Sequence, residues 1–123
     1  METDTAERLL AQLHEIDFPS LYNLSLPVKD RDSLVKLAKQ KLKLVKRQLR
    51  EEMDVIKKRW DGRNSYEAAQ ERLHLAPYKV LDDLIAKLEV AITELEIKGS
   101  EAKPVTFGTQ LVGNFDTGEW HVL

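Results

Sequence analysis

The chain has 123 residues, of which 42% are apolar and 33% are charged, and its formal net charge at pH 7 is -2. This length favours one domain with a modest core, and the small net charge excludes an overall electrostatic attraction to nucleic acid or membranes. The absence of cysteine excludes disulfides, a thiol nucleophile and Cys-ligated zinc. Because the N-terminus lacks a signal-peptide pattern and no apolar run reaches the roughly 18 residues that span a bilayer, we expect a cytoplasmic protein with no membrane partner.

The first predicted element is a short amphipathic helix over residues 4–16. Its apolar residues recur at helical spacing, and Asp4 followed by Glu7 resembles a capping box. Residues 17–30 then form an apolar linker. Because this linker carries many large apolar side chains, we expect it to pack across the rest of the protein.

Two long helices are predicted next, over residues 31–60 and 65–98. In the first, apolar residues recur every three or four positions, which is typical of a coiled-coil seam. The seam consists of Val35, Ala38, Leu42, Val45, Leu49, Met53, Ile56 and Trp60. At 1.5 Å per residue this helix would extend about 45 Å, too far for a compact protein of this size unless a second helix pairs with it lengthwise. The short connection favours antiparallel neighbours, so we predict a long helical hairpin with Leu42 opposite Leu84.

Pro77 lies inside the second long helix. A proline removes one backbone donor and crowds the preceding turn, so we expect a kink near this residue. The apolar arc also swings by roughly 60° at this point when about 100° per residue is assumed. Gly99 is a natural stop for the helix.

The pattern changes over residues 104–123, where apolar residues and glycines predict an extended strap or β-hairpin. The large rings of Phe107, Phe115 and Trp120 are candidate docking residues, because aromatic side chains on a tail anchor it to another surface. That surface could be the chain's own helical hairpin or a partner protein. We therefore predict that residues 1–123 form a single, mainly α domain.

The most specific local feature is a run of seven cations without an acid in residues 36–50. On a helix, six of them fall within an arc of roughly 100° and form a basic stripe that is a candidate site for an anion or a partner. The basic stripe consists of Lys36, Lys39, Lys43, Lys46, Arg47 and Arg50. It could follow a phosphate backbone, although no aromatic residue is interleaved for base stacking. Alternatively it is paired internally, because Asp82, Glu89 and Glu96 recur every seven residues on a flank of the second helix that should face the same side.

Signals for catalysis are weak. His14, His74 and His121 are isolated along the chain, no two carboxylates are set up as an acid and base pair, and no glycine-rich loop opens a helix. We therefore expect no catalytic, metal-binding or cofactor-binding residues and no small-molecule substrate.

Leu37 and Leu44 lie off the main seam and give the first long helix a second apolar face. Either the N-terminal segments or a second copy of the chain could cover this face. The sequence favours a non-enzymatic protein-interaction or assembly module, a scaffold that acts with a protein partner or as a homodimer. The alternative is an anion-binding adaptor that binds RNA, DNA or an acidic protein through the basic stripe.

Overall fold

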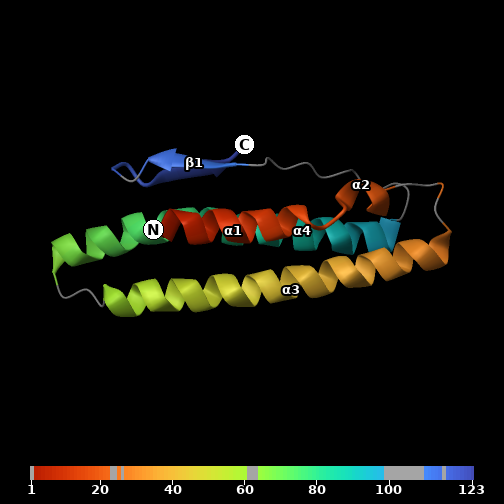
Figure 1. The fold of residues 1–123 in the computed structure, drawn as a ribbon, viewed down its shortest axis with the longest axis horizontal. Helices are drawn as coiled ribbons and strands as arrows, with labels where there is room; N and C mark the ends of the chain where they lie inside the picture. The colour runs from red at the N-terminus through yellow and green to blue at the C-terminus, as the bar shows by residue number, and fades with distance from the viewer. Residues whose placement is uncertain (1, 23–24, 26, 61–63, 99–109, 115) are drawn as a thin grey trace.

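The computed structural model describes residues 2–22, 25, 27–60, 64–98, 110–114 and 116–123. Four helices and two strands follow one another within these residues. They are α1 (Glu2–His14), α2 (Phe18–Leu21), α3 (Val28–Arg59), α4 (Ser65–Lys98), β1 (Leu111–Asn114) and β2 (Glu119–Val122). In Figure 1, α3 and α4 lie lengthwise and antiparallel, and α1 runs alongside them. The predicted mainly α fold, with a long helical hairpin, a short N-terminal helix and a C-terminal β-hairpin, is confirmed.

The first turns of the two long helices are stabilised by different hydrogen bonds. α3 begins directly after Pro27, earlier than predicted, and the Asp30 N–H donates to the Pro27 carbonyl at 3.0 Å to close the first turn. α4 begins after Asn64, whose side-chain oxygen accepts a hydrogen bond from the Glu67 N–H at 2.9 Å. A side chain of this kind satisfies one of the backbone donors that a helix start leaves open.

The predicted apolar linker over residues 17–30 contains a helical turn, α2, that the prediction missed. The Asp17 carboxylate accepts a hydrogen bond from the Ser20 N–H at 3.4 Å, as a helix cap does. Phe18 and Leu21 are only 3% and 1% exposed, so α2 fastens the linker to the core.

The core lies between α1, α3 and α4. Each helix contributes side chains that are almost completely buried, for example Leu13 from α1, Leu49 from α3 and Leu81 from α4, all 0% exposed. Burial of a leucine side chain stabilises a fold by about 1.5–3 kcal/mol. α1 is therefore part of the core and covers one face of the hairpin.

Contacts between α3 and α4 define the register of the hairpin. The Trp60 and His74 rings stack with their centroids 5.2 Å apart, and Lys46 forms an ion pair with Glu89. The residue numbers 60 and 74 add up to 134, and 46 and 89 add up to 135. Residues at the same height in the two helices therefore have numbers that add up to about 134.

The predicted pairing of Leu42 with Leu84 is wrong, because 42 and 84 add up to only 126. Leu42 instead lines a groove together with Ile92, and 42 and 92 add up to 134. Figure 1 shows the first turns of α4 extending beyond the end of α3, which displaces the whole helix along its partner.

α4 continues through Pro77 without a break. The proline ring is less than 2% exposed, so it fills space in the core. In Figure 1 the first turns of α4 are inclined to the rest of the helix, as expected when a proline removes one backbone hydrogen bond.

The C-terminal β-hairpin packs against α1 and α4. β1 and β2 are antiparallel, with Gly113 opposite Trp120. A Cβ atom on Gly113 would overlap the Trp120 ring, so only glycine lets the indole lie flat against β1. Gly118 has a φ of 71°, a conformation that glycine adopts without strain, and it ends the turn.

Candidate partner-binding surface

Half of the basic stripe forms ion pairs with α4. Three cations form ion pairs with the three carboxylates that recur at seven-residue intervals. The pairs are Lys39–Glu96 at 2.5 Å, Lys46–Glu89 at 3.0 Å and Arg50–Asp82 at 3.4 Å. Because these side chains are 33–61% exposed, each pair contributes at most about 1 kcal/mol to stability. We call Lys39, Lys46 and Arg50 the paired half of the stripe.

The other half, Lys36, Lys43 and Arg47, forms no ion pair with α4, although Lys43 lines the groove between α3 and α4. Arg47 approaches Glu51 of its own helix at 4.0 Å, a weak i,i+4 contact between side chains more than 70% exposed. Lys36 and Lys43 form no ion pair with any residue that the structure describes. We call these three residues the open half of the stripe, because their side chains are exposed and none pairs with a carboxylate of α4.

The remaining cation of this segment, Lys41, has a different role. Its Nζ lies 2.6 Å from a Glu15 carboxylate oxygen, next to the end of α1. The ion pair joins the N-terminal segment to α3.

Leu37 and Leu44 lie beside the open half of the stripe. They are 60% and 40% exposed, so the N-terminal segments cover the second apolar face of α3 only in part, where Leu37 lines a recess of about 300 Å³ with Ile16 and Leu21. A recess of about 570 Å³ surrounds Leu44. It is lined by Gln40, Lys43, Leu44, Lys46, Arg47 and Arg50. We call Leu37 and Leu44 the α3 row; an apolar contact flanked by cations is what it offers to a partner.

α4 carries a matching row that sequence reasoning missed. Val90 and Ile97 are seven residues apart and are 59% and 78% exposed. Each follows a buried residue, Leu88 or Leu95, by two positions, which is about 200° round the helix. This offset from the buried seam was the signal in the sequence that could have identified them. We call Val90 and Ile97 the α4 row.

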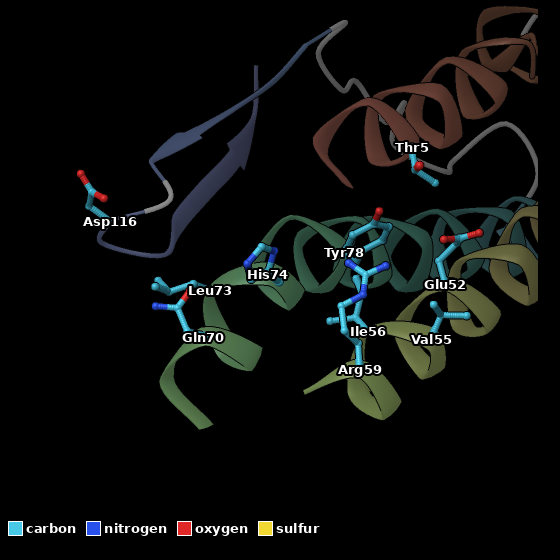
Figure 2. Close-up of a pocket in the computed structure, with 10 residues that line it drawn as sticks. All are labelled: Thr5, Glu52, Val55, Ile56, Arg59, Gln70, Leu73, His74, Tyr78 and Asp116. Atoms are coloured by element: carbon cyan, nitrogen blue, oxygen red, sulfur yellow. The ribbon is translucent and has the colours of Figure 1, made fainter. Parts of the chain in front are cut away.

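A separate recess of about 740 Å³ lies where α3 ends and α4 begins. Figure 2 shows the Arg59 side chain reaching towards Tyr78, His74 beside them, and Asp116 apart on the turn of the β-hairpin. Glu52 adds a second carboxylate. The lining thus combines groups of both charges with apolar side chains and favours no single class of ligand.

The described residues contain no group of three or more His, Asp or Glu that could hold a metal ion. Of the predicted docking residues in the tail, Trp120 is half-buried and packs against the core of its own chain. Phe107 and Phe115 lie outside the described residues.

No protein-family model, curated protein or solved structure matches this chain. Among the described helices, none is both long enough and apolar enough to cross a membrane.

Proposed function

We propose that this protein is a non-enzymatic protein-interaction or assembly module whose contact surfaces are the outer edges of the α3–α4 hairpin. The observation that carries the proposal is the exposure of the α3 row and the α4 row, whose four side chains are 40–78% exposed although both helices already bury their inner faces. Single apolar residues scattered over a surface are ordinary, whereas apolar residues gathered on one helix face and rimmed by polar residues mark interaction sites.

The charge beside the α3 row supports a protein partner with acidic character. Lys36, Lys43 and Arg47 flank Leu37 and Leu44, and no described residue of α4 neutralises them. Apolar contact at the centre with charged pairs at the rim is the usual anatomy of a protein interface.

Site-specific photo-cross-linking tests this proposal, because it captures a bound polypeptide whatever its identity. The protein is expressed in cells with a benzoylphenylalanine in place of Leu44 or Val90, and these cells are irradiated. We expect each position to yield an adduct with a second polypeptide. Glu7, exposed on α1, is the control position and should yield none. Equal yields from the rows and from Glu7 would contradict the proposal.

The open half of the basic stripe supports a second candidate function, an anion-binding adaptor. Three phosphate contacts would make the affinity for duplex DNA or RNA fall about 40-fold between roughly 50 and 200 mM salt. Fluorescence anisotropy with a labelled duplex measures this dependence. Loss of binding in the triple variant Lys36→Glu, Lys43→Glu, Arg47→Glu would support the adaptor; absence of salt-dependent binding in the unmodified chain would exclude it.

A further inference from the structure

We infer that the partner of the α3 row is the α4 row of a second copy of this chain, so that hairpins associate side by side. This inference rests on the proposed function and names the partner of the same surface. It is carried by the position of the two rows and by their charge.

The two rows lie at the same height along the hairpin. The contacts between α3 and α4 join residues whose numbers add up to 132 to 135, as the Arg50–Asp82 and Lys46–Glu89 ion pairs and the Trp60–His74 stack show. The numbers of the α3 row and the α4 row obey the same rule, since 37 and 97 add up to 134, and so do 44 and 90. The two rows also share one spacing, seven residues.

The rows point to opposite outer edges. Leu44 follows the buried Leu42 by two positions, and Val90 follows the buried Leu88 by two positions. A two-residue step is about 200° round a helix, so each row faces away from the seam that joins α3 to α4. The rows cannot meet within one chain. If a second copy lies beside the first in the same orientation, its α4 runs antiparallel to α3 of the first copy. The two helices then have the same register as α3 and α4 within one chain.

Such a contact would place Leu37 against Ile97 of the neighbour and Leu44 against its Val90. The two helices would repeat between chains the register that they already have within each chain. Each helix contributes one apolar residue per seven to this contact, against two in a coiled-coil seam, so the contact is narrow and relies on its flanking charges.

The charges of the two edges are complementary. Of the seven cations in residues 36–50, Lys36, Lys43 and Arg47 form no ion pair with α4, and of the five carboxylates in residues 82–97, Asp83 and Glu94 form no ion pair with a described residue. Glu89 and Glu96 remain 45% and 41% exposed in their ion pairs, so Lys43 and Lys36 of a neighbour could share them. Two α3 rows facing each other would instead bring cations together, which disfavours a contact between identical surfaces.

In a dimer of this kind, one copy keeps an unoccupied α3 row and the other copy keeps an unoccupied α4 row. Further copies can therefore add unless the rotation between neighbours closes a ring. Each interface uses only two apolar pairs and their flanking charges, so association should be weak. The oligomeric mass should therefore rise with protein concentration.

The test uses two variants that each lose one edge. Leu37→Lys with Leu44→Lys blocks the α3 row, and Val90→Lys with Ile97→Lys blocks the α4 row; all four sites are exposed, and circular dichroism checks that the helices persist. Light scattering should show the unmodified chain gaining mass with concentration and each variant alone staying at the monomer mass of 14.2 kDa. An equimolar mixture of the two variants should contain a species of twice that mass, because each retains the edge that the other has lost.

Val55→Lys is the matched control. Val55 is 50% exposed and lies five helical turns from Leu37 on the same side of α3. At its height α4 offers Lys79, since 55 and 79 add up to 134, so this variant should associate like the unmodified chain.

Three outcomes would overturn the inference. They are a mixture that stays monomeric, a single blocked variant that still dimerises, and an unmodified chain that is monomeric at every concentration. The proposed function fails separately, when Leu44 and Val90 yield no cross-linked polypeptide at all. An adduct with a different protein or with nucleic acid, together with a monomeric mixture, would also overturn the inference about a second copy.

Discussion

The two faces of the α3–α4 hairpin are held together in different ways. On the covered face, α1 adds side chains such as Leu13 to a core in which Leu49 and Leu81 are 0% exposed. On the open face, a groove of about 260 Å³ is lined by α3 and α4 residues and is bridged by ion pairs such as Lys46–Glu89. Burial of one leucine contributes about 1.5–3 kcal/mol, whereas one exposed ion pair contributes at most about 1 kcal/mol.

The two faces therefore contribute differently: the covered face stabilises the fold, and the open face favours one orientation of α4 relative to α3. The covered face supplies most of the free energy of folding, because its apolar side chains leave water completely. The ion pairs of the open face add little, but they favour one side of α4 facing the basic stripe over the other. They also remove half of the basic stripe from the surface on which an anionic partner could bind.

The largest expected effect comes from the covered face. Leu49→Ala should lower the free energy of unfolding by about 2–5 kcal/mol, because it removes a fully buried side chain and leaves a cavity. Urea denaturation followed by circular dichroism measures the change. Leu37→Ala, at a site 60% exposed, should change it by less than about 0.5 kcal/mol. Similar losses in the two variants would contradict the division between core and outer edge.

The β-hairpin offers a second way to probe the covered side of the molecule. Gly113→Ala should displace the Trp120 ring, because the new Cβ would overlap it, and should cost about 1–3 kcal/mol. In a Trp60→Phe background, the fluorescence of Trp120 should shift to longer wavelength. Val112→Ala, at a neighbouring site 37% exposed, should leave the emission unchanged. An unshifted spectrum in Gly113→Ala would show that the indole does not pack as described.

The smallest expected effect belongs to the open face. A double-mutant cycle of Lys46→Ala and Glu89→Ala should give a coupling energy of about 0.2–1 kcal/mol at low salt. The coupling should shrink in high salt, because exposed charges are screened. The same cycle with Lys57 in place of Lys46 should give no coupling. A coupling well above about 1 kcal/mol would mean that the open face contributes more than we infer.

Periodicity and the short connection together predicted the hairpin, because two long apolar stripes are buried by pairing lengthwise and a short connection makes the pair antiparallel. The acidic partners of the stripe were also predictable, since Asp82, Glu89 and Glu96 recur every seven residues. α2 was missed although its signal was present, in Asp17 as a cap and Pro19 in the first turn.

The register and the division of the stripe could not be predicted. A connection of about four residues can span up to about 14 Å, so it bounds the displacement of α4 along α3 only loosely and does not fix the register. Which cations pair depends on that displacement and on the side of α3 that faces α4. Lys36 and Lys39 have the same chemistry and are separated by one turn, yet only Lys39 reaches a carboxylate of α4.

A comparison of two triple charge reversals tests the division of the stripe most directly. One variant carries Glu at the paired half and the other carries Glu at the open half, so both lose the same number of positive charges. We expect the paired-half variant to lose about 1–3 kcal/mol of unfolding free energy at low salt, because three ion pairs become repulsive contacts. The open-half variant should lose less than about 1 kcal/mol, and high salt should narrow the difference. Equal losses in the two variants would contradict the division.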